Sequence, residues 1–117
     1  MFDLIRRELT SAQADAWVIY DFGSNNPAFV KVAGRCFTTR KCFAVIDRFG
    51  AKKIICHSID LFSVQHSEAL ADFEVIPYST WQHLEQVLGS VLGSYSCVMM
   101  EISENGMLPR SSFADYG

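Results

Sequence analysis

A chain of 117 residues with 50% apolar side chains can bury one hydrophobic core, so a single domain over 1–117 is expected. The 10 basic and 13 acidic residues leave a net charge of −3, with no basic cluster to neutralise a phosphate backbone, so nucleic acid is not expected as a partner. The sequence has no signal-peptide core, and no apolar run approaches the roughly 18 residues of a membrane span. We therefore expect a cytoplasmic protein without a membrane partner.

The cysteines lie mostly inside apolar, strand-like runs and share no C-x-x-C spacing. This placement predicts buried thiols and argues against disulfides or a zinc site. The four cysteines are Cys36, Cys42, Cys56 and Cys97.

The first elements are a helix, a strand and a second helix. Apolar residues recur at helical spacing over 2–12, which predicts a surface helix with a charged outer face. The apolar run 16–20 predicts a central strand covered on both faces. Residues 22–27 combine turn formers and predict a loop, after which a short helix over 27–32 is ended by Gly34.

Two strands are then expected at 42–46 and 54–56. The link at 47–51 is so short that these strands must form an antiparallel hairpin. The sheet is therefore predicted to be mixed.

A weakly patterned helix follows at 61–70, with Asp60 available as its N-cap. The alternation over 73–76 predicts a half-exposed strand that Pro77 ends.

The clearest helix pattern lies before Gly93. Ser79 and Gln82 form a capping-box signature, and an apolar stripe follows. Gly89 inside this helix suggests a close approach to the sheet. A last buried strand is expected at 97–100. The stripe consists of Leu84, Val87, Leu88, Val91 and Leu92.

The tail from 101 to 117 is expected to form turns around Asn105–Gly106 and Pro109. Its apolar residues lack an evident partner, so we expect a further domain after the tail. The order of elements predicts an α/β layer structure with a mixed sheet of about five or six strands.

Motifs for catalysis are absent. The sequence contains no phosphate-binding glycine motif, no nucleophile elbow and no H-E-x-x-H. His57, His66 and His83 lack metal-ligand spacing, so exposed or helix-face histidines are expected. Asp21 and Asp47 both end strands, where turn capping is favoured over a functional role.

One polar cluster stands out, from Tyr20 to Pro27. Aromatic, acidic and amide residues on a loop beyond a rigid strand are typical of a binding-site wall. The same Asn, Gly and Pro residues equally suit a capped turn, and the residues alone leave both interpretations open.

The segment 15–22, the loop ending in Asn26–Pro27, and Gly34 followed by Thr39–Arg40 together resemble the opening of Xaa-Pro aminopeptidases and dipeptidases. His57–Asp60 is similar to a stretch after the third strand of that family. The piece 105–117 resembles the segment that leads into its catalytic domain.

The resemblance implies a creatinase/prolidase N-terminal domain with a three-layer, ribonuclease-H-like α/β fold. It implies a parent hydrolase whose pita-bread domain, expected after residue 117, cleaves the bond before proline in proline-containing peptides. That domain, as the chain's partner, would hold two divalent metal ions (manganese, cobalt or zinc), whereas 1–117 would be non-catalytic and without a cofactor or metal ligand. The N-terminal domain would gate substrate access and support a homodimer.

By this resemblance, five residues are expected at the rim of a substrate site, and Gly23 stands where relatives often carry an Arg. An alternative is a free-standing α/β module that binds a small molecule or a protein, receiver-like or creatinase-related, suggested by the two strand-end aspartates. The rim candidates are Tyr20, Asp21, Phe22, Asn26 and Arg40.

Overall fold

The fold is built on a six-stranded sheet with the order β4-β3-β2-β1-β5-β6. The computed structural model describes residues 2–22, 26–34, 39–104 and 107–114, with side chains up to residue 100. The strands are β1 (Ala16–Asp21), β2 (Cys42–Asp47), β3 (Lys52–His57), β4 (Glu74–Tyr78), β5 (Val98–Glu104) and β6 (Met107–Ala114).

Strand directions define two edges of this sheet. β1 pairs with β5 in parallel, β3 pairs with β4 in parallel, and β2 runs antiparallel to both β1 and β3. β1, β3, β4 and β5 therefore point the same way. We call the edge where they end the carboxyl edge and the opposite one the amino edge. The predicted mixed sheet and antiparallel hairpin are confirmed.

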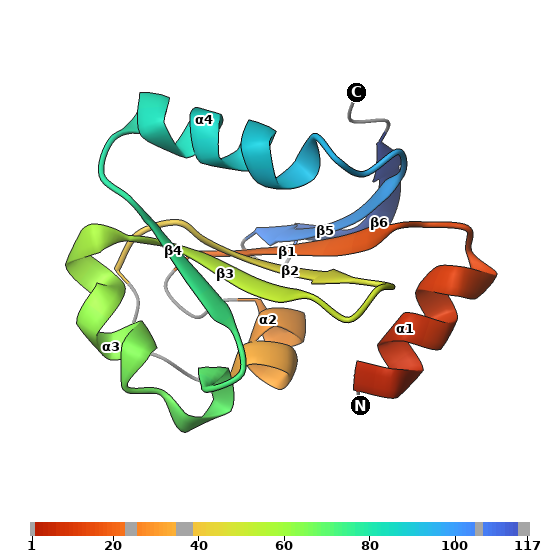
Figure 1. Cartoon of the computed structure of the whole chain (residues 1–117), viewed down its shortest axis with the longest axis horizontal. Helices are drawn as coiled ribbons and strands as arrows, with labels where there is room; N and C mark the ends of the chain where they lie inside the picture. Colours follow the sequence, from red (N-terminus) through yellow and green to blue (C-terminus); the bar gives the residue numbers. More distant parts are fainter. Residues whose placement is uncertain (1, 23–25, 35–38, 105–106, 115–117) are drawn as a thin grey trace.

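Helices cover both faces of the sheet (Figure 1). α1 (Phe2–Ser11), α2 (Pro27–Ala33) and α3 (Leu61–Gln65) lie on one face, and α4 (Trp81–Leu92) lies on the other. The predicted three-layer α/β architecture is confirmed.

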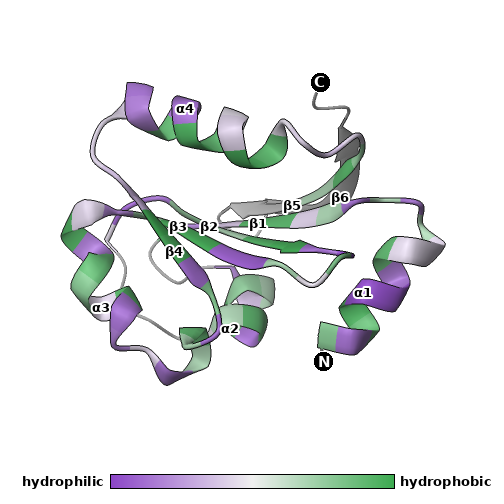
Figure 2. Cartoon of the chain, in the orientation of Figure 1, coloured by the Kyte–Doolittle hydropathy of each residue, from purple (hydrophilic) through white to green (hydrophobic). Residues whose placement is uncertain are grey.

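Side chains point alternately to the two faces along each strand, so each face of the sheet has its own hydrophobic core. Hydrophobic residues dominate the central strands (Figure 2). Neighbouring residues of β1 serve opposite faces: Ile19 packs with Phe29 beneath α2, whereas Val18 packs with Leu84 and Leu92 beneath α4. Each residue of this set is at most 2% exposed.

Two predicted boundaries around β4 were wrong. Pro77 does not end the strand but lies inside it, opposite Cys56 of β3. A proline is tolerated there because β4 is an edge strand. The expected helix over 61–70 is shorter, since α3 ends at Gln65 and a 3₁₀ turn covers Glu68–Leu70.

The helix α4 is confirmed, with its cap one residue later than predicted. Thr80, not Ser79, is the N-cap, and its hydroxyl accepts a hydrogen bond from the His83 amide at 3.0 Å. The suggested close approach at Gly89 is wrong, because a Cβ there would meet no atom within 4 Å. None of the helices in the described part of the chain has the length and apolar character needed to cross a bilayer.

The tail differs most from its prediction. Residues expected to form only turns instead extend β5 and add β6, which pairs with β5 antiparallel at the sheet edge. Pro109 lies within this edge strand, as Pro77 does in β4.

The cysteine prediction is confirmed for two residues. Cys42 and Cys56 are both buried, and neither forms a disulfide. Cys97 also forms none but is only partly buried, because it precedes β5 at the amino edge. Cys36 lies outside the described residues.

Candidate functional site

A shallow pocket of about 250 Å³ lies at the carboxyl edge. It spans the end of β1, the start of β2 and the ends of β3 and β4, which are consecutive strands of the sheet. In α/β sheets this edge is where binding loops gather. The lining residues are Phe22, Arg40, Lys41, His57, Tyr78, Ser79, Thr80, Trp81 and Leu84.

A buried carboxylate holds one wall in place. Asp60 is 4% exposed, and its two oxygens accept hydrogen bonds from the Thr39 amide (3.0 Å), the Thr39 hydroxyl (2.9 Å) and the Arg40 amide (3.1 Å). It occupies the predicted N-cap position of α3 but makes no side-chain cap bond there. Its role is to fix the segment that carries Arg40 and Lys41.

A second hydrogen bond holds the same wall and spans β3. The Tyr78 hydroxyl, at the end of β4, donates to the Lys41 carbonyl oxygen at 2.6 Å. Burial raises the pKa of Tyr78 to about 12, and negative charge on nearby groups, including Asp60, adds to the shift. The phenol therefore stays protonated and keeps donating at neutral pH.

This shift predicts a pH dependence of stability. A folded pKa of about 12, against an ordinary value of 10.0, means that the contribution of Tyr78 is complete below pH 10 and is lost as the pH rises through 12. The wild type should therefore lose stability relative to Tyr78→Phe between these values. Urea unfolding of both proteins at about pH 9 and about pH 11 measures this difference. Parallel pH profiles would contradict the assignment.

Local structure engages both nitrogens of His57. Nδ1 accepts a hydrogen bond from the Ile59 amide at 3.0 Å, so the proton lies on Nε2, which is 3.2 Å from the Ser79 carbonyl oxygen. His57 thus joins the end of β3 to the segment after β4. His66 and His83 also make local hydrogen bonds, to the Phe62 carbonyl oxygen and from the Ser79 amide.

Two exposed aromatic rings and two cationic side chains form the open side of the pocket. Phe22 is 48% and Trp81 58% exposed, and the Lys41 ammonium lies 4.6 Å from the centre of the Trp81 ring. Arg40 adds a guanidinium that is also exposed. Such a surface suits a ligand with a ring and an anionic group, because the rings offer stacking faces and the cations pair with the anion.

The rim candidates divide into two groups. Phe22 and Arg40 line the pocket. Asp21 and Asn26 are each 1% exposed, and the Asp21 carboxylate accepts from the Asn26 amide at 2.8 Å. The Asn26 side chain donates to the Tyr20 carbonyl oxygen at 2.7 Å and accepts from the Ala28 amide at 3.0 Å. These bonds are those of a capped turn.

Tyr20, the remaining candidate, lies on the face that α4 covers. Its ring packs against Phe43 of β2, with 5.3 Å between the ring centres. Tyr20 is therefore placed beside the pocket and is not among its lining residues. Positions 23–25 of the loop, including the Gly23 departure, lie outside the described residues.

The two strand-end aspartates lie far apart. Asp21 pairs with Cys42 and Asp47 pairs with Ala16, so the carboxylates occupy opposite edges of the sheet. Asp47 caps the β2–β3 turn through the Phe49 and Ala51 amides and accepts from the Tyr95 hydroxyl at 2.6 Å. A receiver-like module needs its acidic residues in one cluster, so this version of the alternative is wrong.

The fold is shared with solved structures. At a TM-score of 0.67 and 16% identity, 86% of this chain superposes on 79% of the creatinase/prolidase N-terminal domain of an X-Pro dipeptidase from Streptococcus pyogenes. The N-terminal domain of an Xaa-Pro dipeptidase from Lactobacillus brevis matches at 0.62 and 16% identity, over 92% of this chain and 78% of that one. The chain has the creatinase/prolidase N-terminal fold.

A third structure agrees. A proline dipeptidase from Streptococcus agalactiae matches at a TM-score of 0.62 and 23% identity, over 86% of this chain and 74% of that one. The sequence matches no protein-family model, and no curated protein is significantly similar to it. The predicted resemblance is thus confirmed through the fold.

The described part of this creatinase/prolidase-type fold does not suit a metal. It contains no group of three or more His, Cys, Asp or Glu residues that could hold one ion. The buried carboxylates Asp21, Asp47 and Asp60 instead accept hydrogen bonds from backbone amides.

Sequence reasoning missed much of the pocket. Lys41, Tyr78 and Trp81 were not singled out, although Ser79–Trp81 directly follow a strand. The missing information was that β4 pairs in parallel with β3, which brings the end of β4 to the same edge as Phe22. The sequence did hold one signal for this site, the aromatic residue Trp81 at the first position of the helix with the clearest pattern.

Proposed function

We propose that this chain is the non-catalytic N-terminal domain of a proline-directed peptidase of the Xaa-Pro dipeptidase type. The observation that carries the proposal is the fold, shared over most of the chain with N-terminal domains of X-Pro and Xaa-Pro dipeptidases. The catalytic domain of the parent enzyme follows this one and hydrolyses the bond before proline. The two divalent metals, manganese, cobalt or zinc, belong to that domain.

The carboxyl-edge pocket is the part of this domain that faces substrate. Trp81 offers an exposed ring that suits the apolar ring of proline, and Lys41 and Arg40 offer cations for a peptide carboxylate. Asp60 acts as a positioning residue, since it fixes the segment that bears both cations. The pocket would thereby gate which peptides reach the catalytic domain.

The same proposal includes a cytoplasmic homodimer of the parent enzyme. In such a dimer, the N-terminal domain of one subunit can border the substrate site of its own subunit or that of the neighbouring subunit. Sedimentation of the parent enzyme distinguishes a dimer from a monomer.

Trp81→Ala in the parent enzyme tests the role of the pocket. We expect KM for an Xaa-Pro dipeptide to rise about five-fold with kcat nearly unchanged, because the ring contributes to binding and not to the chemical step. Phe49→Ala is the matched control, since Phe49 is a comparably exposed aromatic (67%, against 58% for Trp81) that follows β2 at the amino edge. Equal KM values for Trp81→Ala and the wild type would overturn the gating role.

A further inference from the structure

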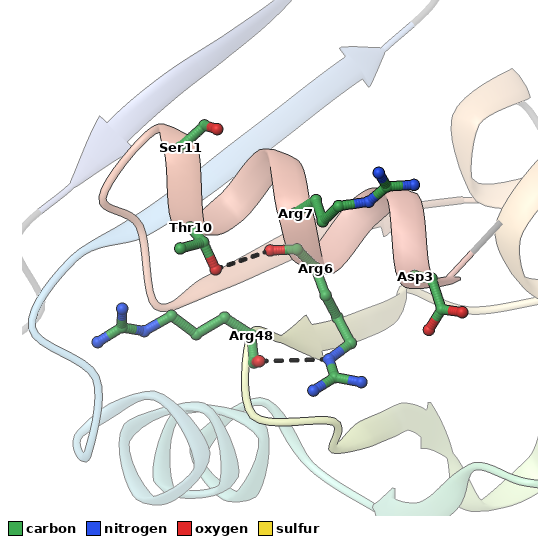
Figure 3. Close-up of a pocket in the computed structure, with 6 residues that line it drawn as sticks. All are labelled: Asp3, Arg6, Arg7, Thr10, Ser11 and Arg48. Carbon is green, nitrogen blue, oxygen red and sulfur yellow. Dashed lines mark hydrogen bonds between the residues drawn. The ribbon is translucent and has the colours of Figure 1, made fainter.

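A second hollow, of about 530 Å³, lies at the amino edge between α1 and the β2–β3 turn (Figure 3). It is on the opposite edge from the pocket described above, because the turn follows Asp47, which pairs with the first residue of β1. Three guanidinium groups line it against one carboxylate. The lining residues are Asp3, Arg6, Arg7, Thr10, Ser11 and Arg48.

Arg48 has a compensating charge. Its Nε lies 3.2 Å from Asp15 Oδ1, close enough for an ion pair although the geometry is not that of a hydrogen bond. The Arg48 amide also donates to the Asp15 carbonyl oxygen at 2.9 Å. This residue therefore forms a fixed wall of the hollow.

Arg6 and Arg7 are not compensated in this way. Both are exposed, and among the side chains that the structure describes, up to residue 100, no carboxylate lies within ion-pair distance of either. The Nε of Arg6 donates to a neutral acceptor, the Arg48 carbonyl oxygen, at 3.3 Å. This bond orients the Arg6 side chain along the hollow and leaves its positive charge available.

The arrangement favours an extended anionic partner. Figure 3 shows the three guanidinium groups pointing in different directions, whereas a compact anion needs donors that converge on one point. Phe49 is 67% exposed beside them, with the Arg48 guanidinium 4.9 Å from its ring centre. Arginine next to an exposed aromatic residue is a composition typical of protein interfaces.

We propose that this hollow docks an acidic segment of another polypeptide, with separate carboxylates on Arg6 and Arg7. The proposal does not depend on the peptidase assignment, since it uses a different edge of the sheet and different residues. Guanidinium forks are suited to carboxylates, and the hollow is open, which leaves room for a chain to lie along it.

Titration of the chain with a hexaglutamate peptide, followed by amide NMR at low salt, tests the proposal. We expect saturable shifts in α1 and at residues 48–49, and a dissociation constant about five-fold weaker for Arg7→Gln, as for loss of one exposed ion pair. Lys31→Gln is the matched control, because Lys31 is an exposed cation on helix α2 and its replacement removes the same charge. Binding should also weaken as salt is raised.

Three results would overturn the docking surface. Absence of saturable shifts would mean that no site exists. An equal loss of affinity in Lys31→Gln and Arg7→Gln would reduce the effect to overall charge. Tighter binding of pyrophosphate than of hexaglutamate to the same amides would identify a compact-anion site in place of a polypeptide one.

Discussion

Replacing Asp60 by Ala is expected to lower the free energy of unfolding by about 3 kcal/mol. The carboxylate is buried and accepts three hydrogen bonds, from the amide and hydroxyl of Thr39 and the amide of Arg40. Its removal leaves these donors without their acceptor and empties a buried position. The segment that carries Arg40 and Lys41 should then lose its fixed position.

Urea unfolding measures the loss of stability, and amide NMR shifts at 39–41 measure the loss of order. Asp72→Ala is the control, because the Asp72 side chain is 86% exposed and its ion pair with Lys52 is 3.9 Å long. We expect this variant to stay within about 0.5 kcal/mol of the wild type. A similarly small effect for Asp60→Ala would show that the carboxylate does not hold the pocket wall.

Gly34→Ala is expected to destabilise the fold by a comparable amount, about 3 kcal/mol. Gly34 ends α2 with φ of 77° and ψ of 171°, a backbone conformation that side-chain-bearing residues rarely adopt. A Cβ at this position would also lie 2.6 Å from the Ala69 Cβ, so the backbone around it must shift. Both effects act in the same direction.

Gly89→Ala supplies the opposite case. Gly89 lies inside α4, and an added Cβ would meet nothing within 4 Å. Alanine is a better helix former, so this variant should gain up to about 1 kcal/mol. Thermal or urea unfolding of the two variants compares them directly, and a stable Gly34→Ala protein would refute the strain assigned to that position.

Sequence reasoning succeeded where local patterns were strong. The apolar stripe of α4 and the continuous run of β1 predicted the right element types, because burial on one helix face or on both faces of a strand leaves a clear periodicity. The short link after β2 was enough to predict the antiparallel hairpin. Together these elements led to the correct α/β class and a mixed sheet.

Edge strands were the main failure. Pro77 and Pro109 are typical strand breakers, yet both lie in strands at the margins of the sheet, where a missing amide donor is tolerated. The position of a strand within a sheet depends on tertiary pairing, which local sequence does not encode. β6 was therefore missed and the end of β4 was placed too early.

The candidate site was predictable only in part, because its contacts also depend on tertiary structure. Phe22 and Arg40 were identified through a family resemblance, and both line the pocket. The contact between Asp60 and Thr39 spans 21 residues, and that between Tyr78 and Lys41 spans 37, so neither leaves a local pattern. Asp21 and Asn26 take part in the hydrogen bonds of a capped turn, an arrangement that the loop composition had also allowed.

Hydrolysis of an Xaa-Pro dipeptide with added manganese is the most direct test of the peptidase assignment. The assay compares this chain with the protein encoded by the reading frame extended past Gly117, and a dipeptide without proline serves as the control substrate. We predict that only the longer protein cleaves the Xaa-Pro bond, and that the control dipeptide is not cleaved. A reading frame that stops after Gly117, or a longer protein without this activity, would contradict the assignment.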